Sequence, residues 1–60
     1  MLEKMIKESL QLLQLPYDKK YIDYIVNDLI YFDIVNTNLW SLITSKEYLQ
    51  TMIKNCDLPN

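Results

Sequence analysis

The chain has 60 residues, half of them hydrophobic, with six lysines, no arginine, eight acidic residues and a net charge of −2. At this length we expect a single domain, 1–60, which can bury only about 60% of the surface that its unfolded chain exposes. The few scattered lysines argue against a basic surface for nucleic acid or an anionic membrane. One cysteine without histidine excludes an intramolecular disulfide and the usual zinc frameworks. Phosphate loops need glycine, and the chain has none.

No segment of the sequence predicts a membrane span or a signal peptide. The longest apolar run, about four residues, is far below the roughly 20 residues that cross a bilayer. Charged residues between Glu3 and Glu8 interrupt the first apolar positions, so the hydrophobic core of a signal peptide is missing. We therefore expect a cytoplasmic protein. The abundance of Ile, Asn, Lys and Tyr indicates an AT-rich source, such as a low-GC bacterium or its phage.

Residues 2–14 form the first expected helix. Its apolar positions recur at the spacing of one helical face: Leu2, Met5, Ile6, Leu10 and Leu13. The residue before a proline is disfavoured in the α conformation, so Pro16 should end this helix near Gln14.

A second helix is expected from about Lys19 to Val35, with Asp18 at its N-cap position. Winding this segment at about 100° per residue gathers six apolar residues on one broad face: Tyr21, Ile22, Ile25, Val26, Leu29 and Phe32. This face is the expected core contact of the helix.

The same helix has a second, smaller apolar stripe of Tyr24, Tyr31 and Val35, flanked by Asp28. An ordinary surface helix has only one apolar stripe. The extra stripe can serve as a contact surface, with Tyr24 and Tyr31 as amphipathic anchors and Asp28 as its polar centre. The alternative is that Asp28 is a solvated residue at the boundary of the core.

A β-hairpin over residues 22–35 is the competing interpretation of this stretch. Asn27 and Asp28 would form a two-residue turn between arms rich in β-branched and aromatic residues. Such turns favour glycine at their second central position, and the chain has none. The helix is therefore preferred.

The last third of the chain predicts a short helical turn and a third long helix. Polar residues 36–38 precede the apolar turn formed by Leu39, Trp40, Leu42 and Ile43. Thr44 and Glu47 are spaced as a capping box that opens a helix from about Ser45 to Asn55. The expected buried face of this helix consists of Tyr48, Leu49, Met52 and Ile53.

Trp40 is expected to plug the core between helices, with an exposed binding hot spot as the alternative. Met5 and Met52 are expected to fill the core. Cys56 follows the apolar face of the last helix, which predicts a buried free thiol, with an intermolecular disulfide as the lesser alternative.

These elements predict an all-α fold, a small bundle of three helices plus a short helical turn. The alternative is an α+β fold with a central hairpin at residues 22–35. We expect no enzyme activity and no cofactor or metal, because general acid–base catalysis most often uses histidine. An aspartate recurs every five residues from Asp18 to Asp33, but this spacing turns successive carboxylates by about 140° and prevents their convergence on one ion.

The sequence favours a small regulator or adaptor that binds another protein. The expected binding residues lie mainly on the second helix: Tyr24, Asp28, Tyr31, Val35 and Trp40. One alternative is a structural module that forms a homodimer to cover its apolar surplus. A weaker alternative is a helix-turn-helix nucleic-acid binder. It is weaker because only two lysines of its second helix, Lys46 and Lys54, would face DNA.

Overall fold

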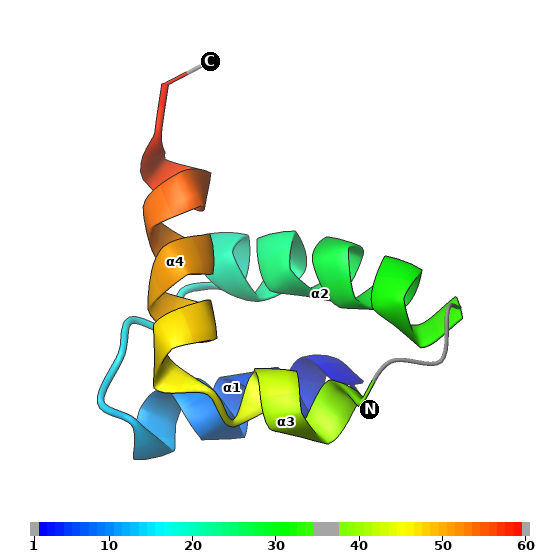
Figure 1. The fold of residues 1–60 in the computed structure, drawn as a ribbon. Coiled ribbons are helices and arrows are strands. Elements are labelled where there is room, and N and C mark those ends of the chain that lie inside the picture. The colour runs from blue at the N-terminus through cyan, green and yellow to red at the C-terminus, as the bar shows by residue number, and fades with distance from the viewer. Residues whose placement is uncertain (1, 35–37, 60) are drawn as a thin grey trace.

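A computed structural model describes residues 2–34 and 38–59, apart from the side chains of 31–34 and 39. Over these residues the chain forms four helices and no strand: α1 (Leu2–Leu12), α2 (Lys19–Ile34), α3 (Leu39–Ile43) and α4 (Lys46–Asp57) (Figure 1). The all-α prediction, three helices plus a short helical turn, is confirmed.

The hairpin alternative over residues 22–35 is wrong, because the backbone is helical without a break from Lys19 to Ile34. Asn27 and Asp28 lie in the middle of this helix instead of in a turn. Val35, the last residue of the expected helix, lies outside the described residues.

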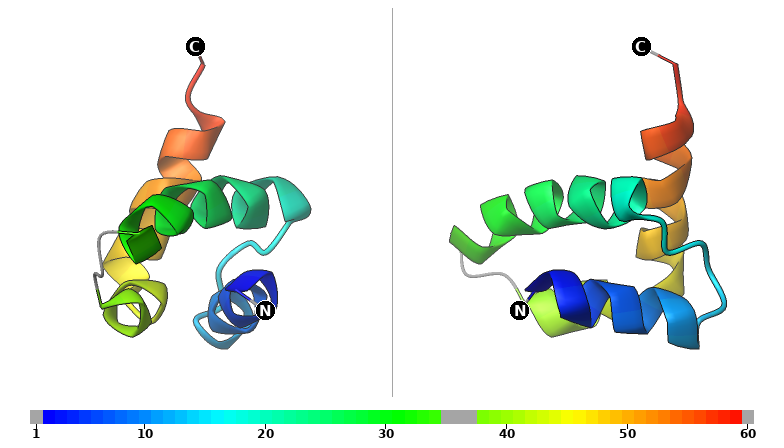
Figure 2. Two further views of the ribbon diagram at one scale, coloured as in Figure 1. Left: turned by 90° about the vertical axis from the view of Figure 1, so that its right-hand side faces the viewer. Right: turned by 180° about the vertical axis from the view of Figure 1, so that it is seen from behind.

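The helices form two layers and a crosswise fourth element. Helices α1 and α3 lie side by side in one layer, and α2 covers them on one side (Figures 1 and 2). Helix α4 runs crosswise to α2 near the beginning of that helix, and its last turns extend past α2 (Figure 1). This arrangement places one side of α2 against the core and another side against α4.

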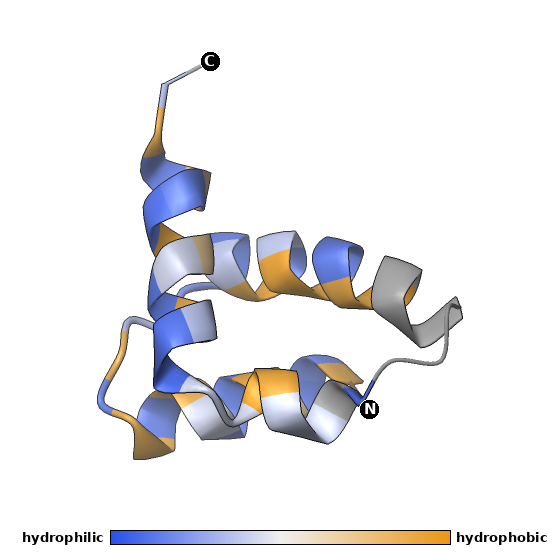
Figure 3. Cartoon of the chain, in the orientation of Figure 1, coloured by the Kyte–Doolittle hydropathy of each residue, from blue (hydrophilic) through white to orange (hydrophobic). Residues whose placement is uncertain are grey.

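The hydrophobic core forms where all four helices meet. Its buried members are Ile6, Leu10, Ile22, Ile25, Leu29, Ile43, Leu49 and Met52. The apolar side of α2 faces α1 and α3, as the orange side of this helix shows in Figure 3. The expected core face of α2 is thus confirmed for its described side chains, with Val26 partly buried at its edge.

Helix α1 ends in a Schellman turn without glycine. The N–H of Leu15 donates to the carbonyl of Leu10 (2.9 Å), and the N–H of Gln14 donates to that of Gln11 (3.1 Å). Gln14 adopts the left-handed conformation that this turn requires, with φ of 59°. Leu15 then packs against the core next to Leu10, so the turn closes with an apolar contact.

The capping residue of α4 is Ser45, one position after the expected Thr44. The Ser45 hydroxyl accepts the N–H of Tyr48 at 3.2 Å. Thr44 still belongs to the last turn of α3, where its N–H and its hydroxyl both donate to the carbonyl of Trp40, the hydroxyl at 2.7 Å. Thr44 is therefore the C-cap of α3, and the capping-box assignment is wrong.

Two expected core residues lie on the surface. Trp40 is 63% exposed and Met5 is 40% exposed, so the predictions that Trp40 plugs the core and that Met5 fills it are wrong. In so small a bundle, other helices cover only one side of α1 and of α3, and Met5 and Trp40 lie outside the covered sides. Met52 of α4, in contrast, is buried as expected, because it belongs to the core where α4 packs on α2.

Candidate protein-binding groove

An open groove of about 290 Å³ lies where α4 crosses α2, lined by Tyr24, Asn27, Asp28 and Met52. Three of these side chains belong to α2 and are spaced by three and four residues, which places them on one helical face. Met52 forms the opposite wall from α4. We call this feature the α2–α4 groove.

Among the described side chains, Asp28 is the only charged one that lines the α2–α4 groove. Its Oδ2 atom accepts a hydrogen bond from the hydroxyl of Tyr48 at 2.5 Å. Both residues are partly buried. Burial of the Tyr48 hydroxyl raises its pKa well above the ordinary value, and the hydrogen bond to Asp28 and the charge of that carboxylate raise it further. Asp28 is therefore a partly buried residue that joins α2 to α4 through a hydrogen bond.

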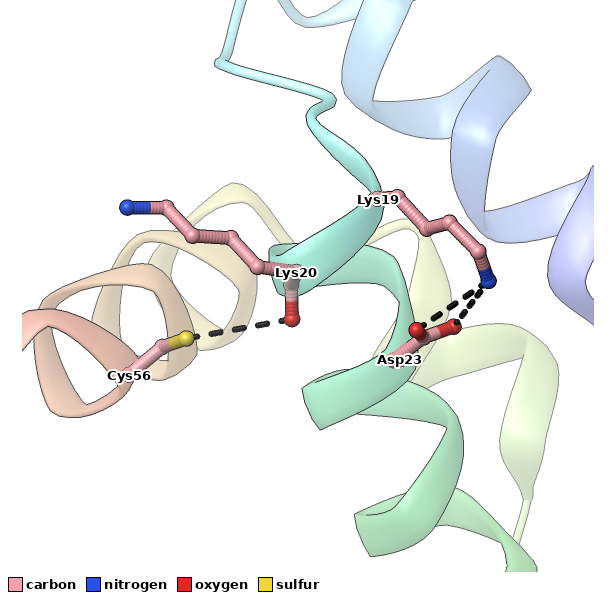
Figure 4. A network of polar contacts seen from close by, with 4 residues as sticks. All are labelled: Lys19, Lys20, Asp23 and Cys56. Atoms are coloured by element: carbon pink, nitrogen blue, oxygen red, sulfur yellow. Dashed lines mark hydrogen bonds and ion pairs between the residues drawn. The ribbon is translucent and has the colours of Figure 1, made fainter.

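No lysine of the chain neutralises Asp28. All six lysines are described, and the two that form ion pairs, Lys19 and Lys20, belong to α2; the pair of Lys19 with Asp23 is drawn in Figure 4. Lys19 pairs with Asp23 at 3.2 Å, one turn along the same helix, and Lys20 pairs with Asp57 at 3.3 Å. The groove consequently carries an uncompensated negative charge.

A second tyrosine–carboxylate contact joins α2 to the last turn of α4. The hydroxyl of Tyr21 donates to Oδ2 of Asp57 at 2.8 Å. This hydrogen bond raises the pKa of Tyr21 and lowers the pKa of Asp57, and the neighbouring Lys20 lowers the pKa of Asp57 further. The contact joins the first turn of α2 to the last turn of α4.

Cys56 lies next to this second contact. Its thiol is half-buried and donates to the backbone carbonyl of Lys20, with an S···O distance of 3.8 Å (Figure 4). The expectation of a fully buried thiol is therefore only partly met. In Figure 4 the side chain of Lys20 extends away from that of Lys19, so the two lysines serve different contacts.

The sequence-predicted binding residues do not all meet in one place. Tyr24 and Asp28 share the α2–α4 groove, and Tyr24 is 38% exposed. The side chain of Tyr31 and all of Val35 lie outside the described part of the chain. Trp40 belongs to α3 and does not line this groove.

The helix that carries Trp40, α3, forms a second surface together with α1. A smaller groove of about 120 Å³ is lined there by Ser9, Leu12, Leu13 and Thr44. Trp40 lies one helical turn before Thr44, so both side chains share a side of α3. Leu12 is 84% exposed at the end of α1. We call this surface the α1–α3 face.

Sequence reasoning missed two lining residues of the groove, Asn27 and Met52, and also Tyr48, the hydrogen-bond partner of Asp28. Asn27 could have been found, because it lies three residues after Tyr24 on the same helical face. Met52 and Tyr48 were assigned to the buried face of the last helix, and no local pattern shows that this helix crosses α2 beside Asp28. Their roles depend on tertiary packing.

Among the described side chains, no group of three or more His, Cys, Asp or Glu residues could hold a metal ion. None of the described helices is long and apolar enough to cross a bilayer. Comparisons with protein-family models, with curated proteins and with solved structures found no match to this chain.

Proposed function

We propose that this chain is a non-enzymatic protein-binding module, a small regulator or adaptor, whose α2–α4 groove contacts the partner. The observation that carries this proposal is the combination of a half-exposed Tyr24 with a partly buried, unneutralised Asp28 in one groove. Tyrosine offers a large contact area with few rotatable bonds and keeps a hydroxyl for orientation.

The rigid support of the groove is the second argument for a binding role. Asp28 is held by Tyr48, and Met52 is anchored in the core. Side chains that are already ordered lose less conformational entropy when a partner binds. A groove built in this way is suited to recognition, whereas the exposed ion pair of Lys19 and Asp23 is not.

Affinity capture from an extract of the source cell tests the proposal. Bait protein carrying Tyr24→Ala should lose a partner that the unchanged protein retains, because the anchor ring is removed. A Tyr24→Ala, Tyr31→Ala double variant extends the test to the second tyrosine of the stripe. Tyr17→Ala is the matched control, since Tyr17 is also exposed, at 47%, but lies outside the groove.

Far-UV circular dichroism of each bait must match that of the unchanged protein. If Tyr24→Ala unfolds the chain, a Tyr24→Gln bait, which retains a long side chain without the ring, is used in its place. A captured partner that remains bound to every folded Tyr24 variant would contradict a binding role for the α2–α4 groove.

Self-association through the α1–α3 face is the second candidate function. Exposed apolar residues of two elements, Met5, Leu12 and Trp40, support it, because such patches on small proteins often mark contacts between chains. Sedimentation velocity at micromolar concentration should then detect a dimer that Trp40→Ala dissociates and Tyr17→Ala preserves. A monomer at that concentration would eliminate this candidate.

A further inference from the structure

We propose that the α2–α4 groove receives the guanidinium group of an arginine side chain from a partner polypeptide. This inference rests on the proposed protein-binding function and names the chemistry of its central contact. It follows from the charge of the groove, from the hydrogen-bonding capacity of Asp28 and from the side chains around that carboxylate.

Charge complementarity requires a cationic occupant. Of the described side chains that line the groove, Asp28 alone carries a formal charge, and the lysines that form ion pairs pair with Asp23 and Asp57. A partly buried carboxylate with a single hydroxyl donor is poorly compensated compared with one that has an ionic partner. A cation entering the groove would supply the missing charge.

Asp28 also retains the capacity to accept hydrogen bonds. Tyr48 occupies Oδ2, and no described donor occupies Oδ1. A carboxylate can accept about four hydrogen bonds in total. The planar fork of a guanidinium donates two parallel N–H groups to one carboxylate, and the amide oxygen of Asn27, beside Asp28 in the lining, can accept a further N–H.

The apolar walls favour arginine over lysine. A guanidinium is planar and weakly hydrated and stacks on aromatic rings, whereas an ammonium is a compact and strongly hydrated charge. Tyr24 provides an aromatic ring at the edge of the groove, and Met52 provides a polarisable apolar wall. Both surfaces can contact the faces of a flat cation.

The occupant must come from a different protein. The chain contains no arginine, so neither its own side chains nor a second copy of it can supply a guanidinium. The arginine groove is therefore independent of self-association through the α1–α3 face.

The test is an NMR titration of ¹⁵N-labelled full chain with N-acetyl-arginine amide at millimolar concentrations. We expect saturable shifts of the Tyr24, Asn27 and Asp28 amide signals. N-acetyl-citrulline amide has the same shape without the charge and should bind at least about tenfold more weakly. N-acetyl-lysine amide should also bind more weakly, because it lacks the planar fork.

Two variants with the same change of charge complete the test. Asp28→Asn keeps an acceptor for Tyr48 but removes the groove charge, and it should weaken arginine binding at least about tenfold. Asp23→Asn removes an exposed carboxylate from the same helix and should leave binding unchanged. Dispersed amide spectra verify that both variants are folded.

The inference is overturned if citrulline or lysine matches arginine, if no saturable shift occurs, or if Asp28→Asn binds arginine as well as Asp23→Asn does. Its failure is distinguishable from failure of the proposed function. A partner that is lost with Tyr24→Ala while the arginine probe fails would leave protein binding intact and remove only the arginine assignment. Arginine binding without any partner that depends on Tyr24 would support the groove chemistry and contradict the protein-binding role.

Discussion

Removal of the Tyr48 hydroxyl by Tyr48→Phe should destabilise the protein by about 1–2 kcal/mol. A hydrogen bond to a charged group contributes about 1.5–3 kcal/mol. The lower part of this range applies because Tyr48 and Asp28 are only partly buried and water can reach the carboxylate when the hydroxyl is absent. This loss is a substantial part of the roughly 3–9 kcal/mol expected for a chain of 60 residues.

The change in melting temperature follows from the same numbers. An unfolding entropy of about 2.1 cal/mol/K per residue amounts to about 0.13 kcal/mol/K for 60 residues. A loss of 1–2 kcal/mol therefore lowers Tm by about 8–16 °C. Thermal and urea unfolding at pH 7, followed by far-UV circular dichroism, measures this effect. Tyr24→Phe is the matched control and should change Tm little, since Tyr24 forms no described hydrogen bond.

A double-mutant cycle with Asp28→Ala separates the contact from other effects of each substitution. Alanine also improves helix propensity at position 28, but this contribution cancels in the cycle. We expect a coupling free energy of about 1–2 kcal/mol between Tyr48→Phe and Asp28→Ala. A coupling below about 0.5 kcal/mol would refute the view that this hydrogen bond fastens α4 to α2.

The other predictions concern the core, the cap of α4 and the alkaline limit of stability. Leu29→Ala, at a fully buried position, should lower the free energy of unfolding by about 2–5 kcal/mol and leave much of the chain unfolded at 25 °C, as a urea titration would show. Ser45→Ala should cost about 1 kcal/mol by removing the N-cap, measured in the same way, and Thr44→Ala should cost less. The pKa of Tyr48 is raised in the folded state by burial and by Asp28. The contribution of this shift to the free energy of unfolding is complete below about pH 10, the pKa of unfolded tyrosine, and is lost as the pH rises through the higher folded value. Urea midpoints should therefore fall as the pH rises above about 10, less steeply for Tyr48→Phe, and an equal slope in both proteins would contradict this assignment.

The parts of the fold that depend on local sequence were predictable. The core face of α2 follows from a 3.6-residue period, and the described members of that face, Ile22, Ile25 and Leu29 among them, are buried. The end of α1 near Gln14 follows from Pro16 and from the geometry of the turn. In both cases the determining residues lie within a few positions of one another.

The features that were missed depend on contacts between distant elements. Periodicity shows which residues of a helix are apolar, but it does not show whether another helix covers them. Trp40 was therefore expected inside the core and lies outside it. In the same way, Tyr24 and Asp28 were found as a pair on α2, while Met52 joins them only because α4 crosses α2 at that point. The cap of α4 was placed one residue too early, on Thr44, because no local pattern shows that Thr44 still belongs to the last turn of α3.

The two tyrosine–carboxylate contacts give the junction of α2 and α4 a defined angle. Tyr21 and Asp28 are seven positions apart, about 10 Å along α2, and Tyr48 and Asp57 are nine positions apart, about 13 Å along α4. With a single hydrogen bond, α4 could rotate relative to α2 over the aliphatic side chains between them, whereas two separated hydrogen bonds restrict this rotation. Weakening either bond should therefore loosen the orientation of α4 before the whole chain unfolds, and hydrogen exchange of its amides would register that loosening first.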